Sequence, residues 1–346
     1  MKIKNLFLAT LTVMAGLTLT ACGSEKTQEP ATTQKDETIT LNFGAMGSID
    51  AVPLVIAQEN GYFKEEGLNV NLEMFTAAKD RDAALQAGQL DGVLADETAI
   101  AIYQNSDMDM QITGSTSGYW TLVATPASNI KSAADLKGKK IAISQNTMIE
   151  YLADDITAAN SISQDDFEKV AIPAMPARLE ALRNNQVDAA ILPAPFNETA
   201  INDGCVAIET IDNTQIMISI TAFLNSVIEE SPEAIQSFYK AYNKAVDYIN
   251  STDISEYEDI VISTVGYSED MRGNIVLPKY EYNYLPAEEK VQQVFDWATN
   301  KGLLTKDIKA ADVPIFLGGE RCPKKYKKPS LQSLYNFPSS SNKKKK

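Results

Sequence analysis

The chain has 346 residues, 46 acidic against 31 basic side chains, a formal net charge of −15 and no histidine. This length accommodates two ordinary domains or one large domain. Without histidine, neither a Ser-His-Asp or Cys-His nucleophile system nor a histidine-based zinc site can be assembled. The acidic balance argues against nucleic acid as a partner, because phosphate neutralisation needs clustered lysine and arginine.

The N-terminus has the pattern of a secretory signal. Lys2 and Lys4 precede an apolar stretch that ends in Leu19-Thr20-Ala21-Cys22, and these last residues resemble a bacterial lipobox. Residues 1–21 are therefore predicted to be a lipoprotein signal peptide, with Cys22 as the lipidated first residue of the mature protein. A transmembrane anchor is the alternative, but the stretch is short for spanning a bilayer. The polar run 22–38 is predicted to be a flexible tether, so the folded part is expected on the extracytoplasmic face of the cell membrane.

From residue 39 on, short β-rich runs alternate with amphipathic helical stretches, a pattern typical of α/β lobes with parallel sheets. The first series of elements predicts a first lobe. It comprises expected strands over 38–43, 69–75, 90–94, 110–113 and 120–124, and expected helices over 52–60, 81–87 and 98–104.

A second series predicts a second lobe, with strands over 140–143, 170–172, 187–192 and 205–211 and helices over 148–160 and 178–184. A strand over 219–224 and long helices beginning at Pro232 and Pro286 follow, and their apolar faces need a lobe to pack on. The predicted division is 39–124 together with 216–317 for lobe one, and 125–215 for lobe two.

The C-terminal segment 318–346 is rich in lysine, proline and serine and has no sustained periodicity. It is predicted to be a basic, disordered tail. Two interpretations of this tail stay open: a segment that contacts anionic lipid, and a read-through or frameshift product.

Four segments carry a family resemblance. They are Gly61-Tyr62-Phe63-Lys64-Glu65-Glu66-Gly67-Leu68-Asn69-Val70, then Ala84-Leu85-Gln86-Ala87-Gly88-Gln89-Leu90-Asp91, then Ala134-Asp135-Leu136-Lys137-Gly138-Lys139-Lys140-Ile141, then Leu182 with Val187-Asp188-Ala189-Ala190. In this order they resemble ABC-importer solute-binding lipoproteins, in the branch that binds nitrate, sulfonates, taurine and thiamine precursors. The resemblance implies an α/β, two-lobed, periplasmic-binding-protein-like fold of type II, with two crossover strands and a ligand cleft between the lobes.

The four segments are themselves mostly structural. Gly61 and Gly67 allow the tight turn from a helix into a strand, while Phe63 and its neighbours are expected to pack on the sheet. Asp91 and Asp188 each precede a buried strand and are expected to hydrogen-bond local backbone. They identify the fold and say little about the ligand.

Ligands of open α/β sheets bind beside the carboxyl ends of the strands, which identifies the loops expected to form the site. Asp96 can alternatively cap the next helix. Strand alternation sends Tyr119 and Trp120 to opposite faces, so only one of them is expected to face the ligand. The predicted ligand-binding residues are Ser48, Asp50, Asp96, Thr98, Ser117 and Tyr119 in lobe one, and Asn146, Thr147 and Phe196 in lobe two.

The loop Lys79-Asp80-Arg81-Asp82 has two interpretations. A cation near a helix N-terminus suits a sulfonate, carboxylate or nitrate. The alternating signs favour instead a self-compensated, solvated turn, and no basic pocket is evident in the lobe-two loops. A polar heterocycle or another nitrogen-containing organic solute is therefore preferred slightly over a simple anion.

The predicted function is capture of a small organic nutrient, either a thiamine-pyrimidine-like heterocycle or a solute of the sulfonate and nitrate class, and its delivery to an ABC permease and its ATPase. The protein is expected to be a monomer and not an enzyme, with no metal, no cofactor and no membrane contact beyond the lipid. The alternatives are a ligand-sensing lipoprotein of the same fold and a relative of pyrimidine synthases, whose histidine and cysteine chemistry this chain lacks. Cys205 is interpreted as a buried free thiol, with a disulfide to Cys322 as the alternative.

Overall fold

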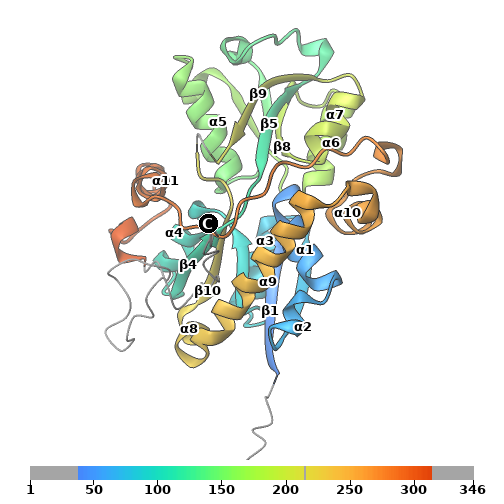
Figure 1. The fold of residues 1–346 in the computed structure, drawn as a ribbon. Coiled ribbons are helices and arrows are strands. Elements are labelled where there is room, and N and C mark those ends of the chain that lie inside the picture. The colour runs from blue at the N-terminus through green and yellow to red at the C-terminus, as the bar shows by residue number, and fades with distance from the viewer. Residues whose placement is uncertain (1–37, 214–215, 314–346) are drawn as a thin grey trace, which may run out of the picture. The chain divides into compact units, whose positions relative to one another are not determined.

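The structure is a computed structural model that describes residues 38–213 and 216–313 (Figure 1). The predicted signal peptide 1–21, Cys22, nearly all of the tether and the basic tail 318–346 lie outside the described residues. Among those described, no helix is both long enough and apolar enough to span a bilayer.

Two five-stranded sheets form the framework, and they have the same topology. The first sheet has the strand order β2-β1-β3-β10-β4, in which β1 pairs in parallel with β2 and β3, and β10 runs antiparallel to both of its neighbours. Its strands are β1 (Ile39–Met46), β2 (Leu68–Phe75), β3 (Gly92–Ala95), β4 (Met110–Ser115) and β10 (Ile220–Leu224).

The second sheet repeats this arrangement in the order β7-β6-β8-β5-β9, with β5 antiparallel to its neighbours. Its strands are β5 (Tyr119–Ala124), β6 (Lys140–Ile143), β7 (Glu168–Ala171), β8 (Ala189–Pro193) and β9 (Val206–Asp212). We call the first sheet with its helices lobe one and the second sheet with its helices lobe two.

The sheet membership of β5 differs from the predicted boundary at residue 124. The strand expected over 120–124 is predicted to belong to lobe one, but β5 pairs with β8 and β9 in the second sheet. The chain therefore crosses between the lobes before Tyr119, and returns between β9 and β10.

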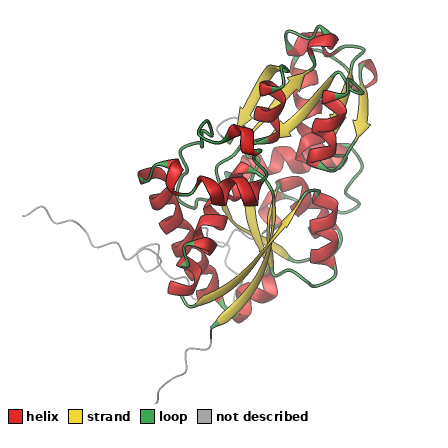
Figure 2. Cartoon of the chain, turned by 90° about the vertical axis from the view of Figure 1, so that its right-hand side faces the viewer, coloured by secondary structure: helices red, strands yellow, loops and turns green. Residues whose placement is uncertain are grey.

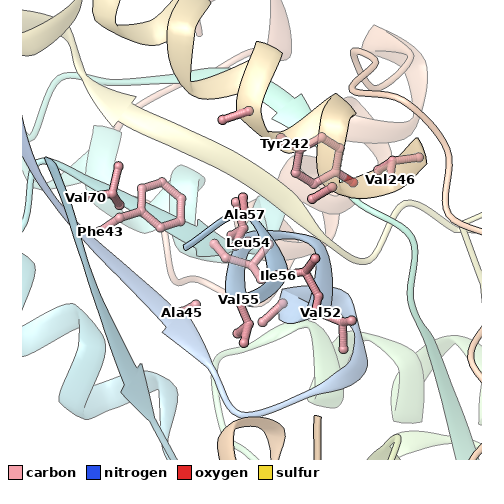
Figure 3. Close-up of a cluster of buried hydrophobic side chains, with 14 of the residues drawn as sticks. Phe43, Ala45, Val52, Leu54, Val55, Ile56, Ala57, Val70, Tyr242 and Val246 are labelled. Carbon is pink, nitrogen blue, oxygen red and sulfur yellow. The ribbon is translucent and has the colours of Figure 1, made fainter. Parts of the chain in front are cut away.

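Helices cover both faces of the first sheet. The core on one face joins Phe43 of β1 to α1 and α9, with Tyr242 and Val246 of α9 packed near Leu54 (Figure 3). On this face lie α1 (Val52–Glu59), α2 (Tyr62–Glu65), α9 (Pro232–Ser251) and α10 (Glu258–Val265), and on the other lie α3 (Ala78–Gln86), α4 (Glu97–Asn105) and α11 (Glu288–Asn300). The short α8 (Asn225–Glu230) connects β10 to α9.

The second sheet is likewise covered on both faces (Figure 2). Side chains of β5 alternate between the two cores: Leu122 and Ala124 contact the cluster that contains α5, whereas Val123 contacts the cluster that contains α6, as expected for a strand buried on both faces. The helices are α5 (Met148–Ala159) on one face and α6 (Met175–Arg183) and α7 (Phe196–Asn202) on the other.

The family segments have structural roles. Gly61 and Gly67 have φ angles of 75° and 80°, a left-handed conformation that favours glycine. Phe63 and Leu68 are buried in the core. The carboxylate of Asp91 accepts a hydrogen bond from the backbone N–H of Asn42 at 2.6 Å, and that of Asp188 accepts one from Lys140 at 2.8 Å. Each aspartate thus links the start of one parallel strand to the next.

Candidate functional site

A cavity lies where strand ends of both sheets converge. Residues at or after the carboxyl ends of β1, β3, β6 and β8 line it, among them Ser48, Asp96, Ser144 and Pro193. The free space among these residues, counting the part that is open to solvent, is about 520 Å³. Both lobes contribute to its wall, as expected for a site at the carboxyl ends of the strands.

Backbone hydrogen bonds link the two lobes beside this cavity. The N–H of Ile49 in lobe one donates to the carbonyl of Ala194 at 3.0 Å, and the N–H of Met175 in lobe two donates to the carbonyl of Thr76 at 3.1 Å. The lobes are therefore in direct contact, and the cavity lies between them.

Asp50 forms part of the lobe-one wall. The hydroxyl of Ser219 donates to Asp50 Oδ2 at 2.6 Å, and the hydroxyl of Ser48 donates to Oδ1. Burial raises the pKa of the Asp50 carboxyl, although these two hydrogen bonds oppose the shift. The carboxyl is thus held in place by donors from two distant segments of the chain.

Asp96 lines the cavity and also caps α4. Its carboxylate accepts a hydrogen bond from the N–H of Ala99 at 3.0 Å, the usual geometry of an N-cap aspartate. Burial raises its pKa, and the charge of Arg81 opposes that shift. Capping and cavity lining, which appear as alternatives in the sequence, coexist at this residue.

Arg81 is a cavity residue rather than part of a solvated turn, which corrects the preferred interpretation of the Lys79–Asp82 loop. Its side chain is only 2% exposed, because α3 begins at Ala78 and turns the guanidinium inward. Arg81 Nη2 lies 2.7 Å from Asp82 Oδ1, and Nη1 donates to the Leu94 carbonyl at 2.9 Å. Burial opposes its charge, but Tyr103, Asp82 and Asp96 outweigh burial and raise its pKa.

Arg178 supplies a basic residue to the lobe-two wall, where the sequence shows no evident basic pocket. It is 2% exposed and lines the cavity. Its Nη1 donates to the backbone carbonyls of Ile172 and Pro173, each at 3.0 Å. No carboxylate of the described residues forms an ion pair with it, and its Nε has no hydrogen-bond partner there. Burial lowers the pKa of Arg178 to about 10, so the guanidinium remains charged at neutral pH.

The remaining cavity wall is mixed. Trp120, Met46, Met175 and Ile218 supply apolar surface. Thr147 lines the cavity and caps α5, accepting a hydrogen bond from the N–H of Ile149 at 3.2 Å. The side chains therefore offer a flat aromatic surface, hydroxyl groups and a cation that pairs with no carboxylate of the described residues.

Of the predicted ligand-binding residues, Ser48, Asp50, Asp96 and Thr147 line this cavity. Ser117 and Tyr119 instead line a second, more open hollow, and the Tyr119 hydroxyl meets the carboxylate of Glu198. Trp120 faces the cavity, which agrees with the expected alternation of this pair.

The other predicted residues lie away from the cavity wall. Thr98 is fully buried in α4. Asn146 has a left-handed φ of 60° and its N–H donates to Glu150 at 2.7 Å, and Phe196 packs against the core of α6 and β8. Cys205 is a half-buried free thiol, and Cys322 lies outside the described residues.

Residues 38–213 and 216–313 contain no group of three or more histidine, cysteine, aspartate or glutamate side chains that could hold a metal ion.

The two-sheet architecture agrees with the family and the solved structures that this chain resembles. The model of the family described as NMT1/THI5 like matches residues 48–253, more than half of the chain, and the protein belongs to this family. A candidate binding protein of Brucella abortus (strain 2308) is 24% identical over 250 residues, which cover 71% of this chain and 76% of the relative.

Solved structures share the fold. The periplasmic aliphatic sulphonate binding protein SsuA of Escherichia coli has a TM-score of 0.68 at 17% identity, covering 80% of this chain and 97% of that one. The periplasmic nitrate-binding protein NrtA of Synechocystis PCC 6803 has a TM-score of 0.64 at 17% identity, covering 80% and 85%. The desulfurization enzyme DSZB is similar as well, with a TM-score of 0.57 at 14% identity over 79% and 95%, so the fold alone does not separate binding proteins from enzymes. The chain thus has the two-lobed periplasmic-binding-protein fold.

Proposed function

We propose that the protein is an extracytoplasmic, lipid-anchored solute-binding protein that captures a small organic nutrient between its lobes and delivers it to an ABC permease and its ATPase. Membership of the NMT1/THI5 like family, the fold shared with SsuA and NrtA, and the lipobox-like residues before Cys22 support this proposal. The observation that carries it is the cavity lined by both lobes, with Arg178 in its wall.

Arg178 favours one of the two ligand classes suggested by the sequence. A buried charge without a partner is costly, and a ligand carrying a sulfonate, carboxylate or similar anionic group would supply the missing counter-charge through charge-assisted hydrogen bonds. Trp120 and the methionines would cover the organic part of such a ligand. We therefore propose an organic anion, in preference to an uncharged pyrimidine.

The ligand class can be tested by isothermal titration calorimetry of the purified protein against alkanesulfonates, carboxylates, nitrate and thiamine pyrimidine precursors. We expect one anion-bearing organic solute to bind per chain, and mass spectrometry to recover it unchanged. Binding of an uncharged pyrimidine without binding of any anion would contradict the anionic class. Chemical conversion of a bound solute would contradict the transport role.

The anchor is tested at Cys22. Because the lipid is attached to the thiol of a lipobox cysteine, Cys22→Ala should abolish labelling by a fatty-acid analogue in cells and leave the precursor uncleaved. Cys205→Ala is the matched control, since Cys205 lies in the folded part between α7 and β9, and this variant should be labelled like the wild type. Labelling that persists in Cys22→Ala would rule the anchor out.

A further inference from the structure

Helix α11 is built into lobe one but reaches lobe two. Val291, Phe295 and Ala298 belong to the same buried cluster as Ile100 and Tyr103 of α4. Val294, which lies beside Val291 and Ala298 on α11, belongs instead to the buried cluster of lobe two. One helix therefore packs into the cores of both lobes.

The polar contacts between α11 and α5 are matched in spacing. Trp297 Nε1 donates to Asp154 Oδ2 at 3.0 Å, and one turn further along, at the C-cap of α11, Lys301 Nζ lies 2.5 Å from Glu150 Oε1. The rings of Tyr151 and Trp297 meet edge to face, with 5.5 Å between their centroids. Since residues four apart share a helix face, each helix presents two polar partners one turn apart to the other.

Glu150 connects this contact to the ligand cavity. Its second oxygen, Oε2, accepts the hydrogen bond from the N–H of Asn146, in the loop between β6 and α5. Ser144 and Thr147 of this loop, together with Ile149 at the start of α5, line the cavity. The Glu150 carboxylate thus connects Lys301 to the backbone of the loop that forms part of the lobe-two wall.

The carboxylates of Glu150 and Asp154 are matched by two lysines only when α11 contacts α5. Lys169 of β7 pairs with both Glu150, at 3.2 Å, and Asp154, so lobe two supplies one lysine for two carboxylates. Lys301 supplies the second positive charge from α11. The Glu150 side chain is only 3% exposed, and leaving a buried carboxylate with half of its compensation is unfavourable. Separation of the lobes would therefore disturb Glu150 and, through it, the Asn146 loop.

We propose that α11 is a clasp: the docking of Trp297 and Lys301 on α5 positions the 144–147 loop, so that the lobe-two wall of the cavity is completed together with contact between the lobes. Glu150, Trp297 and Lys301 are positioning residues in this scheme. The inference goes beyond the proposed transport role, because it rests on contacts within the chain and not on the identity of the ligand.

Hydrogen–deuterium exchange of the ligand-free, full-length protein tests the clasp. The double variant Trp297→Phe with Lys301→Met removes the N–H donor and the cation but keeps a ring and an aliphatic stem. We expect amides of the 144–152 segment to exchange on the order of tenfold faster, with no change in β1 or β2. A second double variant, Trp297→Phe with Lys301→Arg, keeps a cation at position 301 and should restore most of the protection. Small-angle scattering should show a larger radius of gyration for the variant with Lys301→Met than for the wild type.

Lys306→Met is the matched control. Lys306 also lies after α11 and pairs with an aspartate, Asp107, at 2.6 Å, but that pair is exposed and lies within lobe one. This variant should leave exchange at 144–152 unchanged. Unchanged exchange in the double variant would overturn the clasp, and so would equal acceleration in all segments, which would mean a general loss of stability. Neither outcome depends on the ligand, so a failed clasp would leave the proposed function in place.

Discussion

Arg81 in lobe one and Arg178 in lobe two occupy equivalent places in two sheets of the same topology. Each is the fourth residue of a nine-residue helix, α3 or α6, that connects the edge strand of its sheet to the third strand. The backbone N–H of each donates to the carbonyl of the alanine that precedes the helix, at 3.4 Å for Arg81 and 3.0 Å for Arg178. Both side chains are buried and line the cavity.

The two arginines differ in the residue that follows. Asp82 follows Arg81 and forms an ion pair with it, whereas Leu179 follows Arg178 and packs into the lobe-two core. Arg81 therefore has an ion-pair partner in its own lobe, whereas Arg178 has none among the described residues, and we propose that the ligand's anionic group meets Arg178. The residue that follows each arginine, Asp82 or Leu179, thus decides whether the guanidinium forms an ion pair within its lobe.

The largest expected contrast is between Arg178→Met and Arg81→Met. Arg178→Met should weaken binding of the organic anion by about 100-fold, because a charge-assisted contact is worth about 3 kcal/mol at most, and should change the free energy of unfolding by no more than about 1 kcal/mol. Arg81→Met should lower the free energy of unfolding by roughly 2–4 kcal/mol, since it leaves a buried carboxylate network without its cation. Calorimetry and urea unfolding measure the two quantities.

Two outcomes would contradict the proposed difference between the two arginines. One is that Arg178→Met destabilises the protein as much as Arg81→Met does, and the other is that the Arg178→Met variant binds the anion with unchanged affinity. In the first case Arg178 is a structural residue like Arg81. In the second case the ligand's anionic group lies elsewhere, and the proposed ligand class loses its main support.

Much of the fold could be predicted from the sequence because its signals are local. Alternating apolar runs gave most strands and helices, and the loops after the strands contained Ser48, Asp50, Asp96 and Thr147, which line the cavity. The sheet of β5 was not predictable in the same way, because its partners β8 and β9 lie far along the chain.

Arg178 was missed for a different reason. The helix expected over 178–184 begins three residues earlier, at Met175, so the arginine lies inside the first turn and faces the cavity. A signal was present in the sequence: a cation near a helix N-terminus opposes the helix dipole. Arg81 also lies in the first turn of its helix. Because neither arginine stabilises its helix there, their matching positions indicate a role in the cavity wall.

A smaller effect should follow from making lobe one resemble lobe two. Asp82→Asn removes the negative charge beside Arg81 but keeps an oxygen that can accept the hydrogen bond from the Tyr103 hydroxyl. We expect the free energy of unfolding to fall by about 1–2 kcal/mol and the affinity for the organic anion to rise by up to about tenfold, because Arg81 then loses its ion-pair partner and keeps only the charge of Asp96 nearby. Asp80→Asn, at an exposed position of the same helix, is the control for the change in net charge. Equal gains in affinity for both variants would reveal only long-range attraction, whereas a gain confined to Asp82→Asn would show that the neighbouring carboxylate is what keeps Arg81 from acting as a second anion receptor.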